Sequence, residues 1–361
     1  MTALAAGAPT RRRFRELTVA RVDQLCGDAA AVTFGVPEEL ADEFRFEPGQ
    51  SLTLRRMAGG REQRRSYSIC APAGQPLRIG VREVPGGAVS GWLVREVRPG
   101  DQVEVQPPSG SFTPDLSTPG RHVLIAAGSG ITPVLSIAAS VLADGKSEAT
   151  LLYGNRRADT VMFADEIAEL KDAYPARLQL AHVLSREAQE VDLFSGRLDA
   201  DRLQRLLPVL CSPGLGSVDH WWLCGPYGMV TDAMAVLGSL GVPADRVHRE
   251  LFYVEDIAPE QERHVEQPQT GCEVTVVLDG RRTTTVIPAG TPVLDGAQLA
   301  RPDLPFACKG GVCGTCRARL VSGEVAMRRN FALEQAELDA GFVLTCQSLP
   351  TSEQLTVDYD A

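Results

Sequence analysis

The chain lacks long hydrophobic runs and an excess of positive charge, and we expect no export signal. No apolar stretch approaches the roughly 18 residues of a membrane span, so we expect no membrane association. The formal net charge of −10 argues against nucleic acid as a partner, because phosphate binding depends on Lys and Arg. Arg11, Arg12 and Arg13 are not followed by the apolar segment of a twin-arginine signal. These absences predict a cytoplasmic protein in which residues 1–13 form a disordered tail.

Length and composition predict an ordinary globular chain of two to three domains. The chain has 361 residues, of which 44% are hydrophobic and 23% are charged. Residues 14–116 read as short strands separated by Pro-Gly turns, which is typical of an antiparallel β-barrel. Residues 117–255 alternate strand and helix, which predicts a doubly wound parallel sheet. Residues 256–270 are polar and read as a linker before a third compact domain, 271–361.

Several elements can be bounded from periodicity and turn chemistry. In the second block we expect strands at His122–Ala127, Ala149–Tyr153, Leu178–Leu184, His220–Cys224 and Val247–Phe252, and helices at Phe163–Tyr174 and Tyr227–Leu240. In the third block Asp279-Gly280 between two strand-like runs predicts a type I′ hairpin.

Four cysteines near the C-terminus carry the strongest chemical signal. Cys308, Cys313, Cys316 and Cys346 are spaced C-x4-C-x2-C, with the last Cys after 29 further residues, the plant-type ligand pattern of a [2Fe–2S] cluster. Structural zinc more often uses two short ligand pairs, and disulfides are rare in a reducing cytosol. Intervening glycines allow backbone N–H groups to approach the sulfurs. The remaining cysteines, apart from Cys224, are expected to be mostly buried small hydrophobes.

The barrel block contains the segment Arg65-Ser66-Tyr67-Ser68. This segment resembles the R-x-Y-S flavin motif of the ferredoxin–NADP reductase family. The resemblance implies that Tyr67 stacks on the isoalloxazine of FAD, that Arg65 pairs with the pyrophosphate and that Ser68 lies near N5. An aromatic face, a planar cation and a small hydroxyl suit these roles.

Residues 86–93 resemble the glycine-to-serine turn of the same family, which opens a helix on the flavin pyrophosphate. An ordinary β–α turn is the alternative. The preceding strand carries Glu83, where relatives often have a basic residue, and this departure leaves the contact there open. The flavin-site residues implied by this region are Val81, Arg82, Gly87, Val89 and Ser90.

The second block opens with a glycine-rich turn between a strand and a helix. Gly128, Gly130, Thr132 and Pro133 match the family's G-x-G-x-T-P segment rather than the Rossmann fingerprint, and the helix N-terminus there would receive a pyrophosphate. Beyond the second and third strands of this block come Arg156 and the pair Ser185-Arg186. These cations favour the 2′-phosphate of NADPH, although NADH remains possible and the arginines could be exposed loop residues.

Cys224-Gly225-Pro226 matches the C-G-P-x-x-M segment of the family, in which the Cys lies beside the nicotinamide C4 and flavin N5. A buried structural thiol is the alternative for Cys224. Glu250 and Phe252 resemble the family's E-x-F segment near the flavin edge. The resemblance therefore implies that Ser68, Cys224 and Glu250 form the catalytic group.

The resemblance covers residues 14–361 and includes the block order of flavin barrel, nucleotide domain and C-terminal ferredoxin. For the ferredoxin domain it implies an α+β β-grasp fold. The chain is similar to the reductases of bacterial oxygenases, most of all those of phenylacetyl-CoA epoxidases in phenylacetate catabolism. This implies electron transfer from NADPH through FAD and the [2Fe–2S] cluster to a partner oxygenase. The alternatives are a reductase for a Rieske-type oxygenase, such as a steroid 9α-hydroxylase, and a flavin and iron–sulfur sensor without turnover.

Overall fold

The computed structural model describes residues 13–211, 214–252, 271–333 and 335–361. The tail predicted at 1–13, apart from Arg13, and the linker predicted at 256–270 lie outside the described residues. The chain divides into two compact units, Phe14–Tyr253 and Val254–Ala361. Among the described residues, no helix is both long and apolar enough to cross a bilayer.

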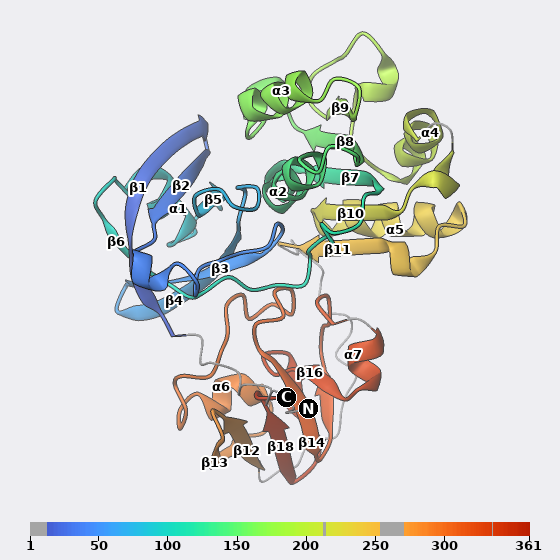
Figure 1. Cartoon of the computed structure of the whole chain (residues 1–361). Helices are drawn as coiled ribbons and strands as arrows, with labels where there is room; N and C mark the ends of the chain where they lie inside the picture. Colours follow the sequence, from blue (N-terminus) through green and yellow to red (C-terminus); the bar gives the residue numbers. More distant parts are fainter. Residues whose placement is uncertain (1–12, 212–213, 253–270, 334) are drawn as a thin grey trace, which may run out of the picture. The chain divides into compact units, whose positions relative to one another are not determined.

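The N-terminal part of the first unit is an antiparallel β-barrel (Figure 1). Its strands are β1 (Arg15–Cys26), β2 (Ala29–Gly35), β3 (Ser51–Ala58), β4 (Arg61–Ser68), β5 (Arg78–Arg82) and β6 (Gln102–Val105), and its helix is α1 (Ser90–Arg95). The strand order is β4-β3-β6-β1-β2-β5, and a bridge between Ile69 and Ile79 connects the two outer strands. Alternate residues such as Leu52, Leu54, Ile79 and Val81 fill the interior. The predicted barrel is confirmed.

The rest of the first unit is a five-stranded parallel sheet, in the order β11-β10-β7-β8-β9. Its elements are β7 (Arg121–Ala127), α2 (Ile131–Leu142), β8 (Glu148–Asn155), α3 (Ala164–Ala173), β9 (Leu178–Leu184), α4 (Ala200–Leu210), β10 (His220–Gly225), α5 (Tyr227–Ser239) and β11 (Val247–Leu251). The chain runs outward from β7 through β9 and then returns to the other side of β7 as β10. The strand order thus reverses between β7 and β10, and ligands bind at such a switch point in doubly wound sheets.

The second unit is an α+β domain with a five-stranded mixed sheet, in the order β13-β12-β18-β14-β16, and a two-stranded sheet of β15 and β17. Its elements are β12 (Cys272–Leu278), β13 (Arg281–Ile287), α6 (Val293–Ala297), β14 (Arg317–Ser322), β15 (Val325–Met327), α7 (Gln335–Asp339), β16 (Phe342–Leu344), β17 (Ser348–Pro350) and β18 (Gln354–Asp358). The four predicted ligand cysteines lie before β14 and between β16 and β17.

Candidate functional site

The two loops at the switch point are in direct contact. A Cβ on Gly130 would lie 2.1 Å from the carbonyl oxygen of Cys224, so only glycine allows the turn after β7 to pack on the turn after β10. Gly128 has φ +56°, which also favours glycine. Gly130 and Gly225 are 95 residues apart in the sequence. The glycine-rich segment and Cys224-Gly225 thus form one continuous surface, called the floor below, at the carboxyl end of the sheet.

The helix that follows the glycine turn presents a free N-terminus to this floor. The turn Gly128–Gly130 runs directly into α2, and the Ile131 N–H already donates to the Gly128 and Ser129 carbonyls. No side chain caps either start, so an anion would meet the N–H groups of the turn itself. The Thr132 hydroxyl donates to the Ser129 carbonyl at 3.0 Å, and Thr132 and Pro133 are buried. α5 likewise begins after Pro226 without a side-chain cap. The predicted Thr132 and Pro133 therefore shape the turn, and any anion would meet its backbone.

Ser68 and Glu250 lie together where the barrel meets the sheet. The Ser68 hydroxyl donates to Glu250 Oε2 at 3.2 Å. Burial raises the pKa of the Glu250 carboxyl to about 8. Cys224 is opposite Glu250 in the β10–β11 register, and burial together with the Glu250 charge raises its pKa well above the ordinary value. The structure therefore brings together the three residues predicted as the catalytic group, and Phe252 packs on the core beside them.

The four residues of the R-x-Y-S segment divide between the two faces of β4. Arg65 and Tyr67 share one face by alternation, and burial raises the pKa of Tyr67 while the positive charge of Arg65 opposes that rise. On the other face, the Ser66 hydroxyl lies 3.1 Å from Thr53 Oγ1. Arg65 is exposed, so its cation can reach an anionic ligand beside the half-buried Tyr67 ring.

The residues expected to bind flavin around positions 81–90 pack in the barrel core or stabilise the turn before α1. The Val81 and Val89 side chains belong to the barrel core, which leaves only their backbones for a ligand. Ser90 Oγ accepts from the Val84 N–H at 3.1 Å, and a Cβ on Gly87 would lie 2.5 Å from that oxygen. The glycine is thus required for the tight turn.

Arg82, the remaining residue of this predicted group, points to the nucleotide side of the unit. Its Nη2 donates to the Thr160 carbonyl at 2.5 Å, and its Nε lies 3.3 Å from an Asp28 carboxylate oxygen. Its expected flavin contact remains a prediction.

The cations expected to select NADPH lie on adjacent loops. The Arg186 N–H donates to the Arg156 carbonyl at 2.8 Å. The Arg156 guanidinium is 3.2 Å from Asp28, and Arg157 is 3.2 Å from Asp159, so both charges are partly balanced. Arg186 and Ser185 stand beside them, and the Arg186 side chain is exposed.

The four C-terminal cysteines form two neighbouring pairs. A hydrogen bond from Cys313 lowers the pKa of Cys308 to about 5, and one from Cys316 lowers the pKa of Cys346. The hydrogen bond with Cys346 and burial raise the pKa of Cys316, and the nearby Cys313 charge adds to the rise, as expected for adjacent pairs. Within the described ranges, no three His, Cys, Asp or Glu side chains converge on a single-ion site. Two thiol pairs suit a binuclear cluster with two thiolates on each iron.

Backbone and amide N–H groups surround these sulfurs. The Gly310 N–H donates to Cys308 Sγ at 3.2 Å, and the Cys308 N–H donates to Cys313 Sγ at 3.5 Å. The buried Gln347 amide donates to Cys346 Sγ at 3.6 Å and to the Lys309 carbonyl at 2.8 Å. Such bonds stabilise negative charge on sulfur, which raises the potential of a cluster.

Three domain families match the chain in the order of its blocks. They are an oxidoreductase FAD-binding domain at 16–113, an oxidoreductase NAD-binding domain at 124–235 and a 2Fe-2S iron-sulfur cluster binding domain at 276–351. The chain is 42% identical to a component of the 1,2-phenylacetyl-CoA epoxidase of Escherichia coli, over 96% of this chain and 98% of that protein. It belongs to the ferredoxin–NADP reductase family, among the oxygenase reductases with a C-terminal plant-type ferredoxin domain.

Other proteins similar to this chain are named as reductases of oxygenases. The ferredoxin reductase component of 3-ketosteroid-9-alpha-monooxygenase from Mycobacterium tuberculosis is 34% identical over the full length of both chains. The structure of phthalate dioxygenase reductase aligns with a TM-score of 0.60 and 25% identity, over 96% of this chain and 98% of that one. The reductase is thus an electron-transfer oxidoreductase of an oxygenase system, and the expected three-part fold is confirmed.

The residues present fit the groups that these domains bind. The exposed Arg65 cation beside the Tyr67 ring suits a flat anionic cofactor, and the uncapped α2 N-terminus suits a dinucleotide. The paired thiols and their N–H donors suit a [2Fe–2S] cluster. When bound, FAD would supply a hydride acceptor and the cluster a one-electron carrier, which suits the reductase to convert two-electron into one-electron transfer.

The prediction from sequence missed residues that orient the site. Gln347 directly follows Cys346, a predicted ligand, and the available signal was this position in the sequence; in the structure Gln347 is buried. Tyr359 donates to Thr345, which donates to the Cys316 carbonyl at 2.9 Å, but no local pattern marks Tyr359. Arg78 was also missed, because an arginine that begins a short strand gives no local sign of a contact 88 residues away.

Proposed function

We propose that this chain is the reductase component of a phenylacetyl-CoA epoxidase and takes its electrons from NADPH in the cytoplasm. The observation that carries the proposal is the 42% identity to the Escherichia coli epoxidase component, over nearly the full length of both proteins. Identity to the steroid monooxygenase reductase of Mycobacterium tuberculosis is 34%, over the full length of both chains. The higher identity favours the epoxidase as the electron acceptor.

Within this function, the barrel side chains hold the flavin and the sheet holds the nucleotide. Arg65 binds the pyrophosphate and Tyr67 stacks on the ring, while the backbone at Val81 and the 87–90 turn complete the flavin pocket. Ser66 and Arg82 support β4 and β5 through their contacts with Thr53 and Thr160. The 128–133 turn and Cys224-Gly225-Pro226 hold the pyrophosphate and nicotinamide of the nucleotide at the switch point. Cys308, Cys313, Cys316 and Cys346 hold the cluster.

The Ser68 hydroxyl and the Glu250 carboxyl keep a hydrogen-bonded pair beside Cys224. Because burial raises the pKa of Glu250 to about 8, its carboxyl is mostly neutral at pH 7. A neutral acid adds no repulsion when negative charge develops nearby. The neutral Ser68–Glu250 pair therefore does not oppose the transfer of a hydride into the site.

The preference for NADPH rests on the charges beside β8 and β9. Arg156 and Arg157 are each paired with an aspartate, whereas Arg186 is exposed next to Ser185. A 2′-phosphate would gain a charge-assisted hydrogen bond from Arg186 and a hydroxyl contact from Ser185. NADH has no group for that contact.

Reconstitution tests the choice of partner. Purified protein is combined with NADPH and either the epoxidase oxygenase or a 3-ketosteroid 9α-monooxygenase oxygenase, each with its own substrate. We expect substrate-dependent product formation with the epoxidase at least tenfold faster than with the steroid enzyme. The reverse order would assign the chain to the steroid system, which the full-length 34% identity makes the second candidate. NADPH-dependent reduction of cytochrome c in the same preparation confirms that the reductase itself is competent.

A further inference from the structure

One strand of the barrel forms the surface on which the nucleotide part docks. Along β5, Ile79 and Val81 point into the barrel core, so alternation places Arg78, Gly80 and Arg82 on the opposite face. A Cβ on Gly80 would lie 2.4 Å from Thr132 Cγ2 and 2.8 Å from Phe163 Cζ. This glycine therefore lets the strand approach the beginnings of α2 and α3 closely.

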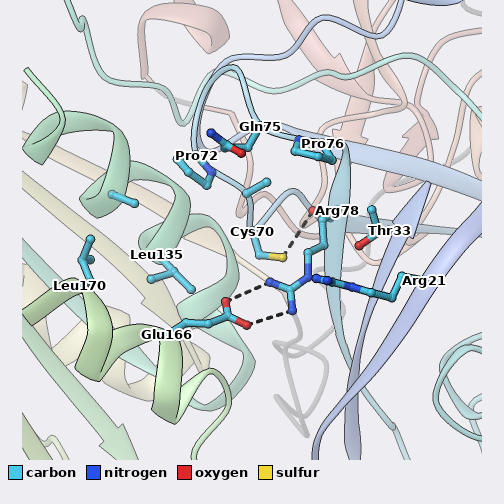
Figure 2. Close-up of a pocket in the computed structure, with 12 residues that line it drawn as sticks. Arg21, Thr33, Cys70, Pro72, Gln75, Pro76, Arg78, Leu135, Glu166 and Leu170 are labelled. Carbon is cyan, nitrogen blue, oxygen red and sulfur yellow. Dashed lines mark hydrogen bonds and ion pairs between the residues drawn. The ribbon is translucent and has the colours of Figure 1, made fainter. Parts of the chain in front are cut away.

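Arg78 crosses this interface as a two-pronged ion pair. Its Nη1 and Nη2 donate to the two carboxylate oxygens of Glu166 at 3.0 and 2.9 Å (Figure 2). The Arg78 side chain is only 14% exposed, and its guanidinium carbon lies 5.5 Å from the centroid of the Phe163 ring. Its Nη2 also contacts Asp23 of β1, at 3.3 Å, but Asp23 belongs to the barrel itself. Fork geometry fixes both distance and orientation, which a single-point contact does not.

The apolar side chains of the interface do not fill the space beside this pair. A cavity of about 430 Å³ lies against Arg78 and Glu166, with Thr33, Cys70 and Leu135 among its lining residues. Figure 2 shows Cys70 and Pro72 of the barrel facing Leu135 and Leu170 of the nucleotide part around it. The Ser136 hydroxyl of α2 donates to the Ala71 carbonyl at 2.6 Å, and the Ala73 N–H donates to Ser140 Oγ at 3.0 Å. The Arg78–Glu166 pair adds a charged contact to these hydrogen bonds and fixes the orientation of α3.

The same interface leads directly to the catalytic group. The Cys70 N–H donates to the Arg78 carbonyl at 2.9 Å, and Cys70 follows Ser68 by two residues. Ser68 in turn donates to Glu250 of β11. The barrel segment 68–78 is therefore held to the nucleotide part at both ends by side chains, through Ser68–Glu250 and Arg78–Glu166, and in between through its backbone at Ala71 and Ala73.

We propose that Arg78 and Glu166 are positioning residues for hydride transfer, which align the nicotinamide-binding sheet with the flavin-binding barrel. Neither touches the reacting atoms. Their fork holds α3 against β5, and this contact sets where the floor at Cys224 meets the barrel edge at Ser68. A displacement of about 1 Å between reacting groups can reduce a rate by about a hundredfold. Loss of the fork is thus expected to slow the chemical step more than it weakens nucleotide binding.

The test compares two carboxylates that contact the same guanidinium. Glu166→Gln breaks the fork across the interface, whereas Asp23→Asn removes a barrel charge from Arg78 and leaves the fork in place. Flavin reduction by NADPH in the full-length holoenzyme is followed anaerobically by stopped flow. NADPH deuterated at the transferred position identifies the hydride-transfer phase.

We expect Glu166→Gln to lower the limiting rate constant of that phase at least tenfold and to change the NADPH dissociation constant less than threefold. Asp23→Asn should keep the rate constant within threefold of wild type. If Glu166→Gln loses flavin, Glu166→Asp, which keeps the charge but shortens the reach, should show the same loss of rate. Unchanged hydride transfer with only a lower melting temperature, or equal losses in the Asp23 and Glu166 variants, would overturn the proposal.

Discussion

Replacing Glu250 with Gln is expected to change how the stability of the first unit depends on pH. Burial raises the pKa of this carboxyl from 4.5 to about 8, because the charged form loses hydration. Between these values the folded protein keeps a proton that the unfolded chain releases. The free energy of unfolding therefore falls as pH rises through this window, and the contribution of the neutral carboxyl is fully present only below pH 4.5.

The size of the effect follows from that pKa. Each pH unit inside the window corresponds to about 1.4 kcal/mol, and the whole window to at most about 5 kcal/mol. In a unit of this size, 1 kcal/mol moves the melting temperature by about 2–4 °C. Gln keeps the shape and an oxygen acceptor for Ser68 but has no charge to desolvate. The variant should therefore match wild type near pH 5, and its advantage should grow by about 3–6 °C per pH unit towards pH 8.

Thermal release of flavin, followed by flavin fluorescence, reports on the unit that contains Glu250. The measurement is repeated at about one-unit steps from pH 5 to pH 8 for wild type, Glu250→Gln and the control Glu39→Gln, whose side chain is exposed. The control should run parallel to wild type. A difference between Glu250→Gln and wild type that stays constant over this range would show that the carboxyl is ionised in the folded protein, and the burial argument would be wrong.

Three further substitutions test the cofactor sites. Cys346→Ser should abolish the visible spectrum of the cluster and the reduction of cytochrome c, while bound flavin and ferricyanide reduction persist, because the predicted ligands lie in the second unit. The control Cys272→Ser, which changes another buried thiol of that unit, should keep the cluster. Equal loss of cytochrome c and ferricyanide reduction in Cys346→Ser would contradict independent sites. Tyr67→Ala should weaken flavin binding by about 1–3 kcal/mol through loss of the stacking face, as measured by flavin retained after dialysis, and full retention would remove Tyr67 from the site. Arg186→Ala should raise the KM for NADPH about tenfold and leave NADH unaffected, because a charge-assisted hydrogen bond contributes about 1.5–3 kcal/mol. Arg157→Ala, which removes a cation already paired with an aspartate, is the matched control, and equal effects on both nucleotides would refute the phosphate contact.

Local chemistry decided several features, and these could be predicted from the sequence. The strand Leu178–Leu184 has the predicted bounds. Asp279 and Gly280 have φ values of 55° and 68°, the positive angles that a type I′ turn requires. The spacing of the predicted cluster ligands is likewise a local property, because three of the four thiols lie within nine residues of one loop.

Helix α4 was not predicted, and its packing explains why. Pro208 lies inside Ala200–Leu210, where local rules expect the helix to end. Leu203, Leu206 and Leu210 form a buried stripe, and Asp199 caps the first turn by accepting from the Arg202 N–H. Burial of that stripe outweighs the local cost of the proline, and burial is a property of the folded chain.

Tertiary structure alone decided the electrostatics and alignment of the site. Ser68 and Glu250 are 182 residues apart, and Arg78 and Glu166 are 88 apart, so neither pair has a sequence signature. Motifs indicated that Ser68 and Glu250 belong to a flavin enzyme, but the raised pKa of Glu250 arises from the side chains that exclude water around it. Residue type and spacing thus determined which groups the chain can bind. Packing determined how far apart those groups are held and which of them are charged.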